Sequence, residues 1–329
     1  MSIILWLGVL IAFFVTLYTV PWWIKRATKA HISGMDMQKL EKPEVAEMGG
    51  IAVLFGFMIG FFYLIAMLTF YIKDENLNLG IFMAAIATII IISVIGMLDD
   101  ILGWKIGLKQ WQKPLLTMIA AIPLIAVNAG VTSMTLPFIG SINLGLFYPI
   151  IIIPLIIAIT SNGFNMVAGY NGLESGLGII ILTALGIFLM INNVAYVPLI
   201  AFIMVGALLA FWLFNKYPAK IFPGDSFTYQ VGALIGVVAI IGNAEKALVI
   251  LFIPYVIEFL LKLRGRFKKE SFSKVLPDGS LKLKYDGIYG LEHFAVWLLR
   301  KIKKKAFEVE VVYFIYAIQL IFVLVLFLI

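Results

Sequence analysis

Residues able to hold a polar ligand are most concentrated in the stretch NGFNMVAGYNGLESG, residues 162–176, which follows an apolar run. Fifteen positions contain three asparagines, one glutamate and four glycines: Asn162, Asn165, Asn171, Glu174, Gly163, Gly169, Gly172 and Gly176. A membrane helix does not carry so many amides in lipid, because each unsatisfied one is costly there. We therefore expect this stretch to lie at a membrane surface, folded around a polar group. Helix capping would account for one or two of the asparagines, but not for all three together with Glu174.

Two adjacent aspartates end another apolar run. The sequence MLDD places Asp99 and Asp100 at the predicted C-terminus of a helix, where the helix dipole disfavours anions. Ordinary helix termination with solvated carboxylates is the alternative. Otherwise a positive group must compensate, either a divalent cation or the lysines that follow, Lys105, Lys109 and Lys113.

Two further polar stretches complete the set. In NKYPAKIFPGDSF (215–227), a Pro-Gly turn presents Asp225 beside the flat apolar ring of Phe222. Asp225 could also cap the helix that follows, which is compatible with metal binding. The stretch SGMDMQKLEKPEVAEMGG (33–50) adds Glu47 before two glycines that allow close backbone approach, although a solvated loop is its simpler interpretation.

The chemistry suited to these residue types is phosphate chemistry with a hard divalent cation. Asp99, Asp100 and Asp225, with amides and lysines, predict a site for Mg²⁺ (or Mn²⁺), which prefers oxygen ligands and substrate phosphates. A zinc site is excluded, because the chain has no cysteine and only two histidines, His31 and His293. The glycines near 172–178 follow no predicted strand, so they do not form a dinucleotide-binding motif.

The elements that must position these residues are membrane helices. The chain is 63% hydrophobic and 13% charged, with a mean hydropathy of +1.06, which excludes an ordinary soluble domain. Its first 24 residues lack a basic start and a small-residue cleavage site, so we expect a retained helix. We predict an all-α polytopic membrane protein forming a single domain over residues 1–329, with ten transmembrane helices: about 2–24, 49–72, 80–98, 114–130, 147–161, 177–192, 197–214, 227–243, 247–263 and 308–328.

The charge distribution predicts the orientation. With Lys262, the loops on one side hold 23 of the 25 Lys and Arg residues, whereas the opposite side holds only Lys73 and Lys246. By the positive-inside rule these loops are cytoplasmic and both termini lie outside. The net charge of +7 is then explained without a nucleic-acid partner. The active site is expected in these cytoplasmic loops, 25–48, 99–113, 162–176, 215–226 and 264–307.

Two small hairpins and one surface helix are expected outside the spans. Alternating residues around Ile139-Gly140-Ser141 predict a hairpin in the outer loop 131–146. The sequence KVLPDGSLKLKY (274–285) predicts a second, cytoplasmic hairpin around its Pro-Asp-Gly turn. Residues 294–307 are apolar and then strongly basic, which is typical of an interfacial helix facing anionic headgroups.

Together the four stretches resemble the polyprenyl-phosphate N-acetylhexosamine-1-phosphate transferases, a family that includes bacterial MraY and WecA and the eukaryotic dolichyl-phosphate GlcNAc-1-phosphotransferase. The resemblance lies in the joint occurrence of DD, NxxNxxAGxNGLExG and NxxPAxIFxGD, and it covers nearly the whole chain. Through AGYNGLESG the chain is most similar to the dolichyl branch. It lacks the His-rich motif of MraY and WecA in the last large loop, where its only histidine is His293.

The resemblance implies a multi-pass enzyme of the cell membrane that initiates lipid-linked glycan synthesis of the N-glycosylation type. Its reaction would be UDP-GlcNAc (or a related UDP-HexNAc) plus polyprenyl or dolichyl phosphate giving the lipid diphosphate sugar and UMP. It further implies Mg²⁺ on Asn165 and Asp225, a catalytic group of Asp99, Asp100 and Lys113, and substrate contacts from Asn171, Glu174, Phe222, Arg264, Arg266, Glu47 and Asn162. Asn171 and Phe222 would hold the uracil, and Lys113 a phosphate.

Several points stay open at this level. Gly265 stands between Arg264 and Arg266 where the dolichyl branch has a histidine, which leaves the identity of the sugar undetermined. A phospho-MurNAc-pentapeptide or other UDP-sugar transferase is the alternative within the family. Lipid length, a homodimer and the division of roles between Asp99 and Asp100 are also undetermined.

The acceptor phosphate is mostly dianionic at neutral pH and needs little base catalysis, so we favour positioning and electrostatic roles for the two aspartates. The lipid must reach them laterally, through a groove between helices involving the ninth. Glu258 in that helix is a functional candidate, and its pairing with Lys262 is the structural alternative. A lipid flippase, the rival from another class, would place its polar groups near the bilayer midplane, whereas here they cluster at cytoplasmic ends.

Overall fold

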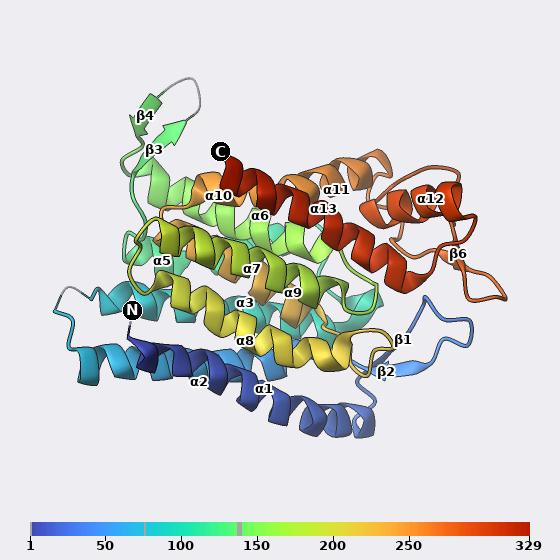
Figure 1. Ribbon diagram of the computed structural model, residues 1–329, viewed down its shortest axis with the longest axis horizontal. Helices are drawn as coiled ribbons and strands as arrows, with labels where there is room; N and C mark the ends of the chain where they lie inside the picture. The colour runs from blue at the N-terminus through green and yellow to red at the C-terminus, as the bar shows by residue number, and fades with distance from the viewer. Residues whose placement is uncertain (1, 76, 137–139) are drawn as a thin grey trace.

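Apolar helices make up most of the protein in the computed structural model, which describes residues 2–75, 77–136 and 140–329. Figure 1 shows them lying side by side, with their axes running roughly from one end of the molecule to the other. Two helices carry a π-helical turn: α2 continues into Met67–Ile72, and Tyr148–Ile152 precedes α6. The helices are α1 (Ile3–Lys29), α2 (Gly50–Ala66), α3 (Leu79–Ile106), α4 (Gln112–Ile119), α5 (Ile122–Ala126), α6 (Ile153–Met166), α7 (Leu173–Ile191), α8 (Val197–Asn215), α9 (Asp225–Ile241), α10 (Glu245–Leu251), α11 (Ile253–Arg264), α12 (Leu291–Lys303) and α13 (Glu308–Leu328).

Within the described residues, seven helical segments are long and apolar enough to cross a membrane. The outer helices expose large apolar side chains, such as Phe14, Tyr18 and Leu324, as expected of surfaces that face lipid. The protein is therefore a multi-pass membrane protein. The seven segments are Ile3–Lys29, Gly50–Ile72, Leu79–Gly103, Tyr148–Met166, Leu173–Ile191, Val197–Asn215 and Glu308–Leu328.

The other three predicted spans also fall on helices, but these are short or broken. The predicted span 114–130 is divided into α4 and α5, and 247–263 into α10 and α11. Each second half has a proline as its second residue, Pro123 or Pro254, which cannot continue the preceding helix because it lacks the N–H and its ring clashes with the turn before it. The third, α9, is a single helix of 17 residues. Ten spans therefore remain a prediction.

Three antiparallel strand pairs lie outside the helices in the described part of the chain. The two predicted hairpins are confirmed for their described strands, β3 with β4 and β5 with β6, while Ile139 lies outside the described residues. The third pair, β1 with β2, was not predicted, and it lies in the loop that carries Glu47. Their bounds are β1 (Ser33–Met35), β2 (Glu44–Ala46), β3 (Ser133–Leu136), β4 (Gly140–Asn143), β5 (Lys274–Val275) and β6 (Leu281–Lys282).

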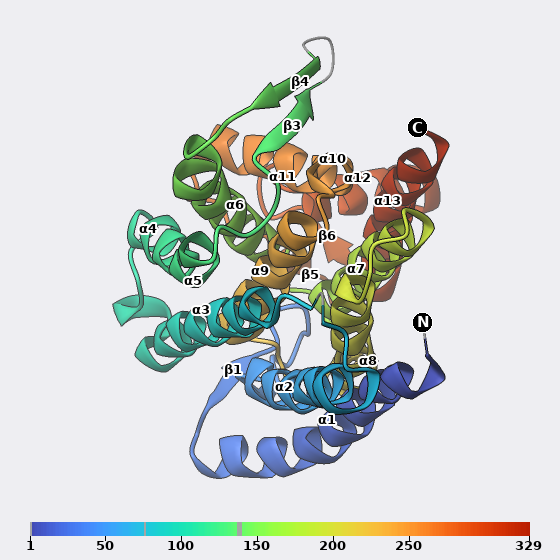
Figure 2. The same cartoon turned by 90° about the vertical axis from the view of Figure 1, so that its left-hand side faces the viewer.

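The helix α9 forms the centre of the bundle. It packs against α2, α3, α6, α7 and α8 and lies among them in the view along the bundle (Figure 2). Every residue from Ser226 to Ile240 is buried. Close approach to its neighbours requires glycines: a Cβ at Gly50 of α2 would lie 2.3 Å from the Phe227 nitrogen, and one at Gly96 of α3 would lie 2.6 Å from the Asp225 carbonyl oxygen. The first turn of α9 is thereby held between α2 and α3.

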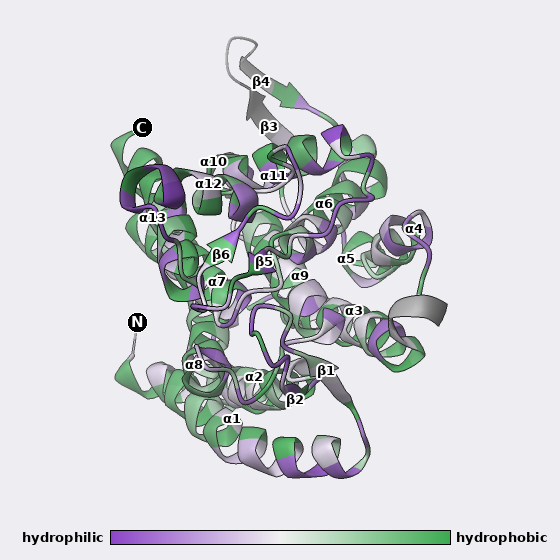
Figure 3. Ribbon diagram, turned by 90° about the vertical axis from the view of Figure 1, so that its right-hand side faces the viewer, coloured by the Kyte–Doolittle hydropathy of each residue, from purple (hydrophilic) through white to green (hydrophobic). Residues whose placement is uncertain are grey.

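The two ends of the bundle carry different elements of the chain. Both chain termini and the β3–β4 hairpin lie at one end, whereas β1, β2, β6 and α12 lie at the other (Figure 1). Figure 3 looks onto the second end and shows hydrophilic segments gathered there among hydrophobic helices. The polar loops that the sequence singles out therefore meet at one end of the molecule.

Candidate active site

The two adjacent aspartates lie inside α3, one turn before its break at Gly103, whose φ is +72°. Asp99 is buried, and its Oδ1 accepts a hydrogen bond from the Leu108 N–H at 2.7 Å. The turn packs closely on this carboxylate, since a Cβ at Gly107 would lie 2.6 Å from the same Oδ1. One oxygen of Asp99 thus fixes the loop after α3, and the other, Oδ2, is left for Lys113.

Asp100 caps α9 from the neighbouring helix. Its Oδ1 accepts from the Asp225 N–H at 2.6 Å, and its Oδ2 accepts from the Ser226 N–H at 3.0 Å. These are first-turn N–H groups with no partner inside α9, and an anion there is favoured by the helix dipole. Gly224, the N-cap residue, has φ +74° and ψ 171°, and makes no side-chain cap. The cap predicted from Asp225 itself is therefore wrong, because Asp225 is already the first helical residue.

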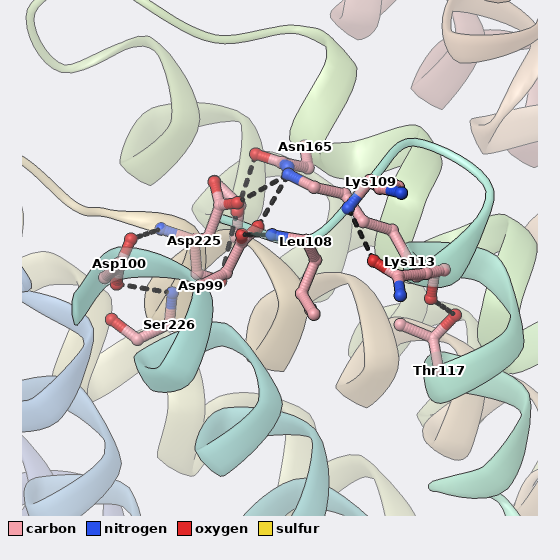
Figure 4. Close-up of polar contacts among 11 residues, drawn as sticks. Asp99, Asp100, Leu108, Lys109, Lys113, Thr117, Asn165, Asp225 and Ser226 are labelled. Atoms are coloured by element: carbon pink, nitrogen blue, oxygen red, sulfur yellow. Dashed lines mark hydrogen bonds and ion pairs between the residues drawn. The ribbon is translucent and has the colours of Figure 1, made fainter. Parts of the chain in front are cut away.

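Lys113 joins two carboxylates (Figure 4). Its Nζ lies 2.6 Å from Asp99 Oδ2 and 3.0 Å from Asp225 Oδ2, and 5.9 Å from the centre of the Tyr229 ring. The compensating charge predicted for the two aspartates is thus supplied in part by Lys113, at the start of α4. Two carboxylates against one ammonium leave this group with a net negative charge, which suits a site that also takes a cation.

Asn165 reaches the same group from the last turn of α6. Its Oδ1 accepts a hydrogen bond from Thr228 Oγ1 at 2.9 Å, and Thr228 lies one turn after Asp225 on α9. Asn162, one turn earlier on α6, donates instead to Thr117 Oγ1 at 2.9 Å and to the Ala158 carbonyl oxygen at 2.8 Å. Of the two α6 asparagines, Asn165 therefore presents its side chain beside Asp225.

Asn165, Asp225 and Thr228 border a cavity of about 370 Å³, which we call the central cavity. It is built by the first polar loop, the 165–174 stretch, the start of α9 and one residue of the last large loop. Three of the four stretches singled out by sequence thus line the cavity, and the fourth, with Asp99 and Asp100, contacts Asp225 and Lys113 from behind this wall. Its lining residues are Met35, Asp36, Met37, Glu47, Asn165, Ala168, Gly169, Tyr170, Asn171, Glu174, Asn215, Phe222, Pro223, Gly224, Asp225, Thr228 and Phe272.

One wall of the central cavity is fixed by a polar network. Asn171 donates from Nδ2 to Asp36 Oδ2 at 2.9 Å, and from its backbone N–H to Glu308 Oε1 at 2.8 Å. Lys39 lies 3.2 Å from Asp36 Oδ2 and also pairs with Glu308. Asn171 is only 5% exposed, so the network holds its amide in one orientation.

Two glutamates line the central cavity. Glu174 is buried and accepts through Oε1 from the Gly169 N–H at 3.0 Å, while its Oε2 has no protein partner. Gly169 has φ +102°, which favours glycine at that position. Glu47 lies across the cavity in the first loop, where burial and the negative charge of Asp100 raise its pKa above the ordinary value.

A second cavity of about 500 Å³, here called the lateral cavity, adjoins the first. Asn165 and Ala168 line both. Exposed Trp111 and Phe259 give it an apolar side. Its lining residues are Gln110, Trp111, Lys113, Pro114, Asn162, Asn165, Met166, Ala168, Phe259, Lys262, Phe267, Lys269 and Ser271.

The predicted site residues are distributed as follows. Asn165, Asn171, Glu174, Phe222, Asp225 and Glu47 line the central cavity, while Lys113 and Asn162 line the lateral one. Arg264 and Arg266 line neither. Both are exposed, and the Arg264 guanidinium lies 5.8 Å from the Tyr289 ring.

Sequence reasoning did not assign Thr228, Phe272 or Lys269 to the site. Helical spacing could have found Thr228, because it stands three positions after Asp225 and so shares its helix face. Nothing in the sequence separates Phe272 or Lys269 from other residues of the last large loop.

The oxygen donors in the central cavity fit a magnesium ion. Within the described residues, no three His, Cys, Asp or Glu side chains are grouped so as to hold a metal by themselves. Mg²⁺, however, is usually held by one or two carboxylates together with substrate phosphates and water. Asp225 and Asn165 offer one carboxylate and one amide oxygen on the same cavity wall, which matches that requirement.

Comparisons with known proteins point to one family. Residues 81–243 match the sequence profile of glycosyl transferase family 4. A protein of Saccharolobus solfataricus, provisionally named a UDP-N-acetylglucosamine–dolichyl-phosphate N-acetylglucosaminephosphotransferase, is 44% identical over 84% of this chain and 83% of its own length. The Dictyostelium discoideum protein of that name is 28% identical over 71% of this chain and 65% of its own. A phospho-N-acetylmuramoyl-pentapeptide-transferase of Streptococcus thermophilus is 31% identical over 75% of both chains.

Proposed function

This chain belongs to glycosyl transferase family 4, and on that premise we propose that it transfers N-acetylglucosamine-1-phosphate from UDP-GlcNAc to a polyprenyl or dolichyl phosphate, releasing UMP. The proposal rests on Asn171, Phe222 and Asp225, which line the same cavity. Asn171 and Phe222 are suited to a nucleobase, and they face the space beside Asp225. The 44% identical relative supports this donor and acceptor over the pentapeptide-transferase alternative, whose relative is 31% identical.

The reaction joins two phosphates. An oxygen of the lipid phosphate forms a bond to the sugar-bearing phosphorus of UDP-GlcNAc, while the bond from that phosphorus to the bridging oxygen breaks. The bridging oxygen leaves on UMP with the electron pair. Because the acceptor is already an anion, bringing it to a diphosphate is harder than deprotonating it.

In this proposal the chain's own residues chiefly bind and position. Phe222 stacks on the uracil and Asn171, fixed by Asp36 and Glu308, bonds to its edge. Asp225 and Asn165 hold Mg²⁺, which when bound neutralises charge on the diphosphate. Asp100 keeps Asp225 in place through the first turn of α9, and Asp99 keeps Lys113 beside it. Glu174, Glu47 and Asn162 line the space for the remaining donor and acceptor groups. The predicted pyrophosphate contacts of Arg264 and Arg266 rest on the family resemblance alone.

The membrane arrangement is part of the proposal. We infer ten spans, with α4–α5, α9 and α10–α11 added to the seven long segments, both termini outside and the site on the cytoplasmic face of the cell membrane. The concentration of Lys and Arg in the loops at the site end supports this. Because the chain contains no cysteine, Asp278→Cys and Lys246→Cys can each be labelled alone. An impermeant maleimide on intact cells should label the second and not the first, and the reverse would contradict the orientation.

The activity itself is tested with purified protein, UDP-[³H]GlcNAc, a polyprenyl phosphate and Mg²⁺. Labelled lipid and UMP should appear, and EDTA should abolish both. Asp225→Asn should also abolish them, whereas Asp286→Asn, a matched change of an exposed loop aspartate, should not. Release of UDP in place of UMP would contradict phosphosugar transfer. If label passed to lipid only from UDP-MurNAc-pentapeptide, the alternative within the family would hold.

A further inference from the structure

The lateral cavity carries more positive charge than the reaction described so far uses. Among the residues that the structure describes, three lysines line it, Lys113, Lys262 and Lys269, and none of its described lining residues is Asp or Glu. Lys113 is already committed, because two carboxylates lie within 3.0 Å of its Nζ. An anion entering this cavity must therefore find its cationic partner elsewhere on the wall.

Lys262, near the end of α11, is held so that its ammonium is fixed at this wall. Its Nζ donates to Ser271 Oγ at 2.6 Å and lies 3.4 Å from Glu258 Oε1. Its side chain is 15% exposed. A lysine ammonium has three N–H donors, and these two partners take at most two of them. At least one donor remains for a ligand in the cavity.

The partner that holds Lys262 is itself anchored. Glu258 is fully buried, and its Oε2 accepts a hydrogen bond from the Leu291 N–H at 2.6 Å, in the first turn of α12. The second oxygen is close to the chain as well, since a Cβ at Gly290 would lie 3.0 Å from Oε1. Glu258 therefore cannot swing away from Lys262 without uncapping α12. Glu258 lies 3.4 Å from the Lys262 ammonium, farther than the contacts of 2.6 and 3.0 Å that Lys113 makes, and the buried Glu292 also attracts the Lys262 charge.

The rest of the lateral cavity is suited to an apolar chain. Phe259 and Phe267 lie with ring centres 5.6 Å apart, and Phe259 and Trp111 expose 42% and 63% of their surface. Phe259 and Lys262 stand three positions apart on α11, on one side of the helix. A ligand with an anionic head and an apolar tail would meet the ammonium and the rings together.

We infer that Lys262 binds the phosphate of the lipid acceptor, with Glu258 and Ser271 holding its ammonium in place. The inference rests on the proposed function and adds to it a residue for acceptor recognition. Glu258, which sequence alone leaves between a functional and a structural role, acts here as a positioning residue. The acceptor phosphate is then bound by Lys262 on α11, in the cavity that shares the wall residue Asn165 with the central cavity.

Steady-state kinetics of Lys262→Ala test the inference. Loss of a charge-assisted contact to phosphate should raise KM for the polyprenyl phosphate by about 10- to 100-fold and leave KM for UDP-GlcNAc within about twofold. Lys262→Arg, which keeps the charge, should restore most of the affinity. Ser271→Ala removes only one hydrogen bond, so the lipid KM should rise by a few-fold. Lys268→Ala is the matched control, because Lys268 is an exposed lysine in the loop that carries Ser271.

A direct binding measurement separates this inference from the proposed function. Calorimetry with farnesyl phosphate and with farnesol, on wild type and Lys262→Ala, needs no turnover. Wild type should prefer the phosphate over the alcohol, and Lys262→Ala should lose that preference. An unchanged preference, or equal rises in both KM values, would overturn the role of Lys262. A wild type that labels no lipid from any UDP-sugar would overturn the proposed function, while the binding result still decides on Lys262.

Discussion

Replacing Asp100 by asparagine tests whether this carboxylate positions the site or acts as a base. In the structure both of its oxygens accept backbone N–H groups of α9, at 2.6 and 3.0 Å. Asparagine retains one acceptor oxygen and turns its NH₂ group toward the other N–H, so one bond is lost and one donor is left unpaired. A hydrogen bond to a charged acceptor contributes about 1.5–3 kcal/mol, and an anion at a helix N-terminus about 0.3–1 kcal/mol.

The expected loss is therefore about 2–4 kcal/mol of stability, localised at the start of α9. The midpoint of thermal unfolding in detergent should fall by several degrees. Because Asp225 is the first residue of α9, the transfer rate should fall at least tenfold. That fall should be the same at every pH at which wild type is active. Asp286→Asn, in an exposed loop, controls for the loss of one negative charge.

The assay measures label transfer from UDP-[³H]GlcNAc and thermal unfolding on the same preparation of Asp100→Asn. A variant with an unchanged unfolding midpoint, whose rate recovered as the pH rose toward about 9, would refute the positioning argument. Such behaviour would mean that Asp100 removes a proton that hydroxide can remove in its place. A loss of both stability and rate that is independent of pH would support the cap.

Three other predictions follow from particular contacts. Gly224→Ala should cost about 1–3 kcal/mol of stability and most of the activity. The backbone angles φ +74° and ψ 171° are unfavourable for alanine, and its Cβ would lie 2.6 Å from Asp100 Oδ2. A variant with normal thermal unfolding and normal turnover would contradict this prediction. Phe222→Ala should raise KM for UDP-GlcNAc by about tenfold through lost stacking and leave KM for the lipid phosphate unchanged, and equal changes in both would argue against a nucleobase contact. Burial and the charge of Glu258 raise the pKa of Glu292, so its carboxyl binds a proton more tightly in the folded state and destabilises the fold increasingly as the pH rises above about 4.5. Glu292→Gln should therefore gain stability relative to wild type as the pH rises, which thermal unfolding from pH 4 to pH 8 would reveal, and parallel stability curves would contradict it.

Much of the general architecture follows from local sequence pattern. Apolar runs of membrane-spanning length predict helices independently of their neighbours, because a backbone in lipid must satisfy its hydrogen bonds within the segment. The seven long helices and the strands of both predicted hairpins follow from such patterns. The breaks before Pro123 and Pro254 were also readable in principle, although the predicted spans 114–130 and 247–263 ignored them. A proline alone does not mark a break, however, because Pro21 lies inside the continuous helix α1.

The side-chain partners could not be predicted in this way. Asp100 binds the N–H of Asp225 across 125 positions of sequence, and Asn171 binds Asp36 across 135. No local pattern records such pairs, so the sequence suggested that Asp225 caps its own helix. It also placed Arg264 and Arg266 at the site by motif, whereas the lysines that line the lateral cavity are Lys113, Lys262 and Lys269.

The sequence by itself therefore determined the class of protein, the order of its polar loops and the residue types available for phosphate chemistry, because these depend on composition and short-range periodicity. Only the tertiary structure decided which partners the aspartate oxygens and the lysine ammonium groups have. That depends on how α3, α4, α6 and α9 pack, since the packing consumes both oxygens of Asp100, engages Lys113 with two carboxylates, and leaves the ammonium of Lys262 with a donor to offer.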